Sequence, residues 1–387
     1  MRKMWKLHIV AMIGFVVLAV LALGSATSPA PTTQPLTSAE PVGRAALWVN
    51  GELQILSDVS SSASSVAVSD GDVYVVGSIA GWDRAILWVN GVPQALSDMR
   101  SLASDIHISN SYVYITGTVF ERDGTASEQL RSRRATLWVN GEPQTLSNLE
   151  SQARAVFVSG NDVFVVGFVY EGGATASERT RSRRATLWVN GVPQTLGNYQ
   201  TTLHSVFASG GNVYVAGITR APAAPLGRGM RATLWVNGVP QTLSNTFSRA
   251  FSVFVYGSDV YVMGDVDGQG WNTNVTLWVN GVPQTLGNTG SPLGSVFVHG
   301  NNVYVAGSND TGQYQVFHYR GHRERLWVSY EKAALWVNGT LQTLNDPESL
   351  NRRAFVVREF SLFIPSSSAR SVFVYGDDVF VVGEIRK

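Results

Sequence analysis

The repeat that decides the fold is clearest in residues 137–167. Leu137-Trp138-Val139-Asn140-Gly141 is followed, after a short polar stretch, by Ala155-Val156-Phe157-Val158 and then by Asp162-Val163-Phe164-Val165-Val166-Gly167. These runs are rich in β-branched and aromatic residues, which favour strands. Asn-Gly readily takes the two positive φ angles of a type I′ hairpin, and Ser-Gly-Asn-Asp can turn the second pair of strands in a similar way. The stretch therefore predicts two β-hairpins.

The same pattern recurs along the whole chain. The sequence Leu-Trp-Val-Asn-Gly occurs seven times, with tryptophans at Trp48, Trp88, Trp138, Trp188, Trp235, Trp278 and Trp336. The second unit also occurs seven times, ending at Gly77, Gly117, Gly167, Gly217, Gly264, Gly307 and Gly383. Two hairpins make a four-stranded antiparallel sheet, and seven such sheets predict an all-β, seven-bladed propeller.

The order of strands within a blade follows from proline. A proline stands just after the Asn-Gly turn at Pro93, Pro143, Pro193, Pro240 and Pro283. Because proline cannot donate to a strand ladder, this segment is predicted to be the outermost strand, D. Leu-Trp-Val is then strand C, and the second unit supplies strands A and B, with A at the axis. The chain begins with a C–D hairpin at 45–57 and ends with an A–B hairpin at 371–383, so these halves are expected to form one composite blade that closes the ring.

This pattern resembles the kelch-like class of β-propellers over about 340 residues. Asp-Val-Tyr-Val-Val-Gly at 72–77 is similar to strand B of those proteins, although the double glycine of kelch repeats is reduced here to one glycine per blade. The chain is more similar to exported bacterial propellers whose repeats carry a Trp-x-Asn-Gly turn. The resemblance implies a fold and leaves the function open.

Composition excludes several classes of protein. There is no cysteine, which rules out disulfide scaffolds, thiol catalysis and cysteine-ligated metal sites. The chain has 29 basic and 28 acidic residues, so a nucleic-acid-binding protein is not expected. Hydrophobic residues make up 44% of the chain and charged residues 15%, which is typical of a folded protein.

The N-terminus has the pattern of an export signal. Arg2, Lys3 and Lys6 precede an apolar stretch at 7–23 and the small residues Gly24-Ser25-Ala26. We interpret 1–26 as a signal peptide or an uncleaved N-terminal anchor, 27–43 as a Pro/Thr/Ser-rich linker and 44–387 as the propeller. The expected location is secreted, periplasmic or at the cell surface, the expected state is a monomer, and membrane contact is expected only through the anchor.

A basic ring is expected on the face that carries the B–C and D–A loops. Because nearly all the insertions lie in these loops, that face is the candidate binding face. A basic residue stands four positions before the tryptophan in six blades, at Arg44, Arg84, Arg134, Arg184, Arg231 and Lys332. The functional interpretation is a rim that binds an anionic ligand. The alternative is repetition of one solvated or locally paired residue.

A second candidate set lies where strand A enters the axial channel. These positions differ between blades and are occupied by Ser64, Ser104, Arg154, His204, Phe251, Gly294 and Arg370. We expect Arg154, His204, Phe251 and Arg370 to form a ligand site, whereas the alternative is ordinary lining of a water-filled channel. The tryptophans are interpreted as packing between blades rather than as a sugar-binding ring.

No catalytic set and no cofactor are predicted. His318 and His322 have HxxxH spacing, which requires a helix to converge on a metal, and Asp265-Val266-Asp267-Gly268 lacks the further ligands of a calcium loop, so no metal site is assigned. We therefore expect a non-enzymatic binding module for a protein, a glycan or an anionic component of the cell envelope. The alternatives are a carbohydrate- or lactone-active enzyme with its site in the axial funnel, and a structural protein of surface display.

Overall fold

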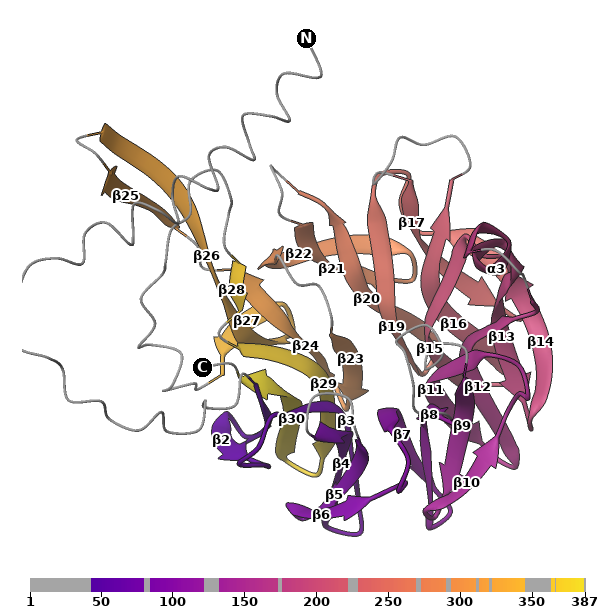
Figure 1. Ribbon diagram of the computed structural model, residues 1–387. Coiled ribbons are helices and arrows are strands. Elements are labelled where there is room, and N and C mark those ends of the chain that lie inside the picture. Colours follow the sequence, from indigo (N-terminus) through magenta and orange to yellow (C-terminus); the bar gives the residue numbers. More distant parts are fainter. Residues whose placement is uncertain are drawn as a thin grey trace, which may run out of the picture. The chain divides into compact units, whose positions relative to one another are not determined.

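Seven four-stranded units follow one another around a central axis (Figure 1). The computed structural model describes residues 43–385 with the exception of 80–83, 122–131, 173–175, 222–228, 269–272, 290–293, 311–312, 320–321, 345–362 and 366. The signal segment expected at 1–26 and almost all of the linker expected at 27–43 lie outside the described residues. Within the described part, no helix is long and apolar enough to cross a membrane.

Each blade has the predicted order A–B–C–D from the axis outward. The innermost strands A are β3 (Ser61–Ser69), β7 (Ser101–Ser109), β11 (Ser151–Ser159), β15 (Thr201–Ser209), β19 (Ser248–Tyr256), β23 (Ser295–His299) and β29 (Ser367–Tyr375). Strands B are β4 (Asp72–Ile79), β8 (Tyr112–Phe120), β12 (Asp162–Tyr170), β16 (Asn212–Arg220), β20 (Asp259–Asp267), β24 (Asn302–Asp310) and β30 (Asp378–Ile385). Strands C are β5 (Arg84–Val89), β9 (Arg133–Val139), β13 (Arg183–Val189), β17 (Met230–Val236), β21 (Thr273–Val279), β26 (His322–Val337) and β1 (Arg44–Val49). Strands D are β6 (Val92–Ala95), β10 (Glu142–Thr145), β14 (Val192–Gly197), β18 (Val239–Thr242), β22 (Val282–Thr289), β27 (Thr340–Thr343) and β2 (Glu52–Ile55).

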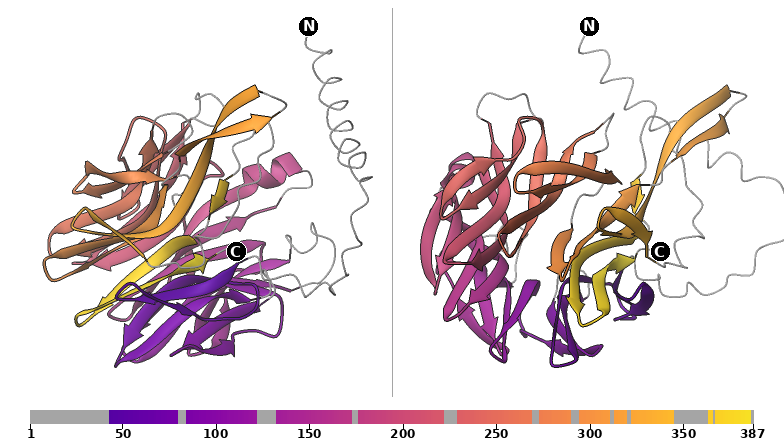
Figure 2. Two further views of the ribbon diagram at one scale, coloured as in Figure 1. Left: turned by 90° about the vertical axis from the view of Figure 1, so that its left-hand side faces the viewer. Right: turned by 180° about the vertical axis from the view of Figure 1, so that it is seen from behind.

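The ring is closed by the two ends of the propeller. β1 pairs antiparallel with β30, so that Trp48 lies opposite Val381, and the sheet order is β2-β1-β30-β29. Figure 2 shows the indigo and yellow strands side by side in this blade. The predicted all-β, seven-bladed propeller with a composite closing blade is therefore confirmed.

Two segments differ from the sequence-based expectation. The B–C connection of the sixth blade, where the sequence predicts a loop as in every blade, contains β25 (Gln313–Tyr319) paired antiparallel with the first half of β26. The short strand β28 (Phe363–Pro365) runs parallel to β26 beside this hairpin. In the third blade, the connection from β12 to β13 includes the helix α3 (Ala176–Ser182). Neither segment belongs to the repeat, so periodicity gave no signal for it.

Each interface between blades is an apolar cluster centred on one tryptophan. Seven such clusters occur among the described residues, and in each the strand C tryptophan of one blade packs against the preceding blade. Trp188 packs against Ala135 and Leu137 of the second blade, and all seven tryptophans are at most 1% exposed. The interpretation of these residues as inter-blade packing is therefore confirmed, and a sugar-binding tryptophan ring is excluded.

The Asn-Gly turn of each C–D hairpin is hydrogen-bonded to the A–B hairpin of the same blade. Both residues have positive φ in every repeat, for example 52° at Asn190 and 80° at Gly191, as a type I′ turn requires. The Asn190 carboxamide accepts a hydrogen bond from the Val163 backbone N–H (2.8 Å) and donates to Asp162 (2.8 Å). Because the Asn oxygen makes the corresponding backbone contact in all seven blades, the turn face is uniform.

A bulge interrupts six of the seven innermost strands at the same place. In β11 the pairing with β12 shifts between Ala153 and Ala155, so that Arg154 is the extra residue. The strand B glycine lies opposite, and a Cβ at Gly167 would collide with the Gln152 carbonyl oxygen. The single glycine of each repeat thus makes room for the bulge. The bulged residues are Ser64, Ser104, Arg154, His204, Phe251 and Arg370.

Polar side chains just after the bulge join neighbouring innermost strands. Ser205 accepts a hydrogen bond from the Val253 N–H of the next blade (3.2 Å). Asp105 joins three blades, because its carboxyl accepts hydrogen bonds from the Ser65 hydroxyl of the preceding blade (2.7 Å) and from the Val156 N–H of the following blade (3.0 Å). Removal from water raises the pKa of Asp105 above its ordinary value of 3.8, although these hydrogen bonds oppose the shift.

We expect Trp188→Ala to destabilise the propeller by roughly 3–5 kcal/mol, because it leaves a cavity between the second and third blades. The measurement is denaturant unfolding of the full chain, with Trp188→Phe as a control that keeps most of the apolar contact. A loss below about 1 kcal/mol for the alanine variant would contradict tryptophan-centred packing.

We expect Asp105→Asn to change how stability depends on pH. As pH rises from 3.8, the carboxyl ionises first in the unfolded chain, so the native protein loses stability until pH exceeds the higher native pKa. The neutral amide removes this loss. The melting temperature of the variant minus that of the wild type should therefore increase over this range and then level off. A difference that stays constant from acid to neutral pH would show that the native pKa is not raised.

Candidate functional site

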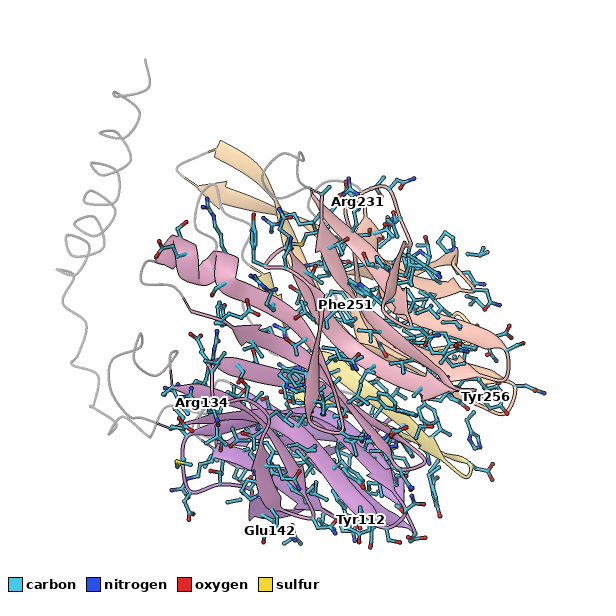
Figure 3. The ribbon with its side chains drawn as sticks, turned by 90° about the vertical axis from the view of Figure 1, so that its right-hand side faces the viewer. Tyr112, Arg134, Glu142, Arg231, Phe251 and Tyr256 are labelled. Atoms are coloured by element: carbon cyan, nitrogen blue, oxygen red, sulfur yellow. The ribbon has the colours of Figure 1, made fainter. Side chains whose placement is uncertain are left out.

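The bulge brings three predicted site residues from consecutive blades into contact. Arg154 Nη1 lies 3.2 Å from His204 Nδ1, and the His204 ring meets the Phe251 ring edge-on with 5.2 Å between centroids. In Figure 3, Phe251 lies between the loop end of the blades, marked by Arg134 and Arg231, and the turn end, marked by Tyr256. The expected grouping of Arg154, His204 and Phe251 is thus present at the level of the bulges.

The fourth predicted residue, Arg370, has a different environment. Its guanidinium donates to the Glu384 carboxylate of the adjacent strand at 2.9 Å. An arginine that is already paired has its charge compensated within the blade. Arg370 therefore differs from Arg154, although both occupy the bulge.

Arg154 and two other arginines surround one buried aromatic ring, that of Phe168. The guanidinium carbons of Arg133, Arg154 and Arg183 lie 5.0, 5.8 and 5.2 Å from the centre of the Phe168 ring. Such cation–π contacts stabilise partly desolvated guanidinium groups. They do not neutralise the charge, and the three cations repel one another.

Carboxylates compensate one arginine of this group, Arg133, and the nearby Arg249. Arg133 is paired with Glu150 at 2.9 Å. On the other side of His204, Arg249 makes a two-pronged ion pair with the fully buried Asp265, with its shortest contact at 2.6 Å. The pairing with Arg249 also accounts for Asp265, which the sequence placed in an incomplete calcium loop.

Arg154 and Arg183 have only neutral partners in the part of the chain that the structure describes. Arg154 donates to His204, and Arg183 donates to the Thr201 carbonyl oxygen and to the Thr202 hydroxyl (2.7 Å) and interacts with the Tyr170 hydroxyl. Burial, together with repulsion from Arg183 and Arg133, lowers the pKa of Arg154 to about 10. Both side chains remain protonated at neutral pH, so the described residues leave two positive charges at this site without a carboxylate partner.

His204 is neutral and its tautomer is fixed by its neighbour. Burial, and then the positive charges of Arg154, Arg249 and Arg183, lower the pKa of His204 well below its usual value of 6.5. Because a guanidinium can only donate, Nδ1 accepts from Arg154 and the ring proton lies on Nε2. Nε2 is buried and has no acceptor among the described residues. Among the described residues, the site thus presents the His204 Nε2–H group as a donor without an acceptor.

Comparison of the two duplicated blades explains why Arg183 has no carboxylate partner among the described residues. Arg133 and Arg183 occupy equivalent positions in the repeated Ser-Arg-Arg segments, and Glu150 lies 17 residues after Arg133. The residue 17 positions after Arg183 is Gln200. A neutral amide therefore stands where the other blade has the compensating carboxylate. Arg183 is absent from the site predicted from the sequence, and this single substitution is the signal that could have identified it.

The basic ring is present, and part of it is locally paired. Each residue of the ring opposes the loop end of strand B, as in the pairs Arg134 with Val119 and Arg184 with Val169. Arg134 is bonded to Glu121 at 2.9 Å and Arg184 to Glu171 at 3.0 Å. The other members are Arg44, Arg84, Arg231 and Lys332, at the equivalent positions of their blades.

Acidic and histidine side chains do not gather into a metal-ion cluster in the described residues. No group of three or more histidine, aspartate or glutamate side chains is placed to hold a metal ion there. His318 and His322 lie on the strands β25 and β26, which confirms that their segment is not helical.

The comparisons with known proteins give no family. No family model matches the chain, and no curated protein matches it, so the resemblance to kelch-like propellers stays a prediction.

Among solved structures, a puromycin-hydrolysing peptidase of Mycobacterium tuberculosis is 14% identical with a TM-score of 0.44, covering 75% of this chain and 55% of that one. An acylaminoacyl peptidase of Pyrococcus horikoshii is 13% identical with a TM-score of 0.43, covering 76% and 46%. A GH32 β-fructofuranosidase of Bombyx mori is 10% identical with a TM-score of 0.35, covering 84% and 90%.

The chain therefore spans about half the length of these peptidases. Similarities at this level carry no argument about activity.

Proposed function

We propose that this protein is an exported binding module that captures its ligand through an anionic group on the B–C and D–A loop face. The ligand would be a protein, a glycan or another component of the cell envelope that carries carboxylate, sulfate or phosphate groups. The proposed location, secreted, periplasmic or at the cell surface, rests on the sequence of residues 1–26.

The observation that carries the proposal is the charge balance around Phe168. Among the described residues, Arg133, Arg154 and Arg183 lie beside Phe168 and Arg249 lies next to Phe251 and His204, whereas two carboxylates, Glu150 and Asp265, pair with arginines of this set. Like charges in a partly buried site raise the free energy of the protein, because water screens them less than at the surface. An anion between Arg154 and Arg183 would remove that repulsion. The loss of the repulsion would make the free energy of binding more favourable.

The chemistry of the donors suits oxyanions. A guanidinium presents parallel N–H groups that match two oxygens of a carboxylate, sulfate or phosphate, and charge-assisted bonds of this kind are stronger than neutral ones. Arg154 is held in place by His204 and Phe168, and Arg183 by Thr202 and Phe168. Because both side chains are already ordered, little conformational entropy is lost when the anion binds.

Binding experiments with acidic ligands also test the two other hypotheses from the sequence. A carbohydrate- or lactone-active enzyme needs acid and base groups in the funnel. Three carboxyls on the two inner strands of their blades are engaged by other groups: Asp265 with Arg249, Glu384 with Arg370, and Asp105 with Ser65 and Val156. Release of product from a bound ligand would support the enzyme. A display protein would bind no envelope component.

We expect Gln200→Glu to weaken binding of acidic ligands without removing any arginine. The new carboxylate would pair with Arg183, as Glu150 pairs with Arg133. Ligands selected on an array of acidic and neutral glycans, with phosphate and sulfate polymers included, are titrated by calorimetry against the full chain. Affinity should fall at least tenfold, or about 1.4 kcal/mol, and Arg154→Gln should act in the same direction. Wild-type binding should also weaken as salt rises.

The matched control for this experiment is Arg134→Gln. It removes one arginine from the same face, but one that is paired with Glu121. It should change affinity little, and Gln200→Glu should melt no lower than the wild type. Equal losses for Arg134→Gln and Arg154→Gln, or unchanged affinity in Gln200→Glu, would contradict the assigned site.

A further inference from the structure

A belt of partly exposed aromatic side chains lines the axis beyond the bulges. It is formed by the residues three positions after each bulge, or after the equivalent Gly294 in the sixth blade: His107, Phe157, Phe207, Phe254, Phe297 and Phe373, with Ala67 in the remaining blade. Successive rings are in contact, with 4.5 Å between the centroids of His107 and Phe157 and 4.1 Å between those of Phe157 and Phe207. The following three pairs are 4.8, 4.8 and 4.7 Å apart.

The belt lies on the turn-face side of the anion site. Each innermost strand runs from the loop face, through the bulge, to the turn face, and three residues of extended strand cover about 10 Å at most. Arg154 and Phe157 on β11, like His204 and Phe207 on β15, therefore occupy two successive levels of the channel. Phe373 also packs against the cluster that contains Ala67, so the blade without an aromatic side chain is covered as well.

We propose that the aromatic belt is the floor of the binding site, so that the ligand enters only from the loop face and presents a compact anion or a single terminal or pendant anionic group. A polyanionic chain is not threaded through the propeller. This deepens the proposed function, on which it rests, because it specifies how the anionic group is attached to the rest of the ligand.

The chemistry of the belt supports a closed floor. Its phenylalanines offer no hydrogen-bond donor, so a charged chain that crossed them would lose its hydration without compensation. The one polar ring, His107, is neutral at physiological pH, because burial lowers its pKa to about 4. The cationic groups that could hold an anion, Arg154 and Arg183, are on the loop side only.

Two engineered cysteines on opposite sides of the belt can test the inference. The natural chain has no cysteine, so each variant carries a single reactive thiol. Ser104→Cys places it at the bulge of β7 on the loop side of His107, and Ser109→Cys places it at the turn-face end of the same strand. The rate of alkylation by a charged, water-soluble maleimide is measured for both variants, alone and with saturating orthophosphate or long-chain polyphosphate.

We expect both probes to slow alkylation of Ser104→Cys several-fold and to leave Ser109→Cys unchanged. Protection should disappear when Arg154→Gln and Arg183→Gln are added to the Ser104→Cys chain, which excludes non-specific coating of the surface. Melting temperatures of all variants are compared with the wild type to show that the blades are intact.

The other outcomes separate the two proposals. If polyphosphate protects both cysteines in a manner that depends on the arginines, the ligand passes the belt and the closed floor is wrong, although the anion site stands. If neither probe protects Ser104→Cys, or protection persists without the arginines, the proposed anion site fails and the inference falls with it.

Discussion

The bulge in the innermost strand is the constraint on which the site depends. A regular strand would direct every second side chain into the interface between blades, where each repeat needs the same apolar residues. One extra residue is left outside this pairing, so it is free to vary, and the sequence varies there from serine to arginine, histidine and phenylalanine. The strand B glycine makes this possible, because any side chain at Gly167 or Gly217 would collide with the bulged backbone.

The repeated blade structure around the bulge fixes the relative positions of the bulged side chains, whichever residues occupy them. Tryptophan-centred interfaces and Asn-Gly turns repeat with little change, so the position of residue 154 relative to residue 204 is set by the architecture. The contacts of Arg154 with His204, and of His204 with Phe251, follow from their equivalent places in consecutive blades. Function can then differ between blades without any change in the backbone.

The sequence predicted the fold in detail because its signals are local and repeated. Seven Asn-Gly turns fixed the hairpins, and the prolines after them placed strand D at the edge. Periodicity also picked out Arg154, His204 and Phe251 as a group, since they break an otherwise uniform column. It could not show that Arg370 is paired with Glu384, because that pairing depends on which side chains face each other across two strands.

The aromatic belt and Arg183 were missed for opposite reasons. The phenylalanines of the belt belong to the repeat, so they looked like core residues, and their partly exposed rings meet only when seven blades are arranged around an axis. Arg183 looked like a copy of Arg133, because the important difference lies at Gln200, on another segment. Charge compensation links residues that are distant in sequence, so it becomes visible only when the partners are considered together.

An uncompensated charge in a partly buried site is itself informative. Duplication of a blade would be expected to copy the Arg133–Glu150 ion pair, and a copy with both partners would be the more stable one at that position. The third blade keeps the arginine and lacks the carboxylate, which leaves Arg183 and Arg154 repelling each other beside Phe168. Stability is therefore lower at this one point of an otherwise regular ring, as is common where a protein reserves part of its surface for a ligand. An anion bound there would neutralise the arginines as Glu150 neutralises Arg133 in the preceding blade. Relief of the repulsion between Arg154 and Arg183 would contribute to its binding free energy.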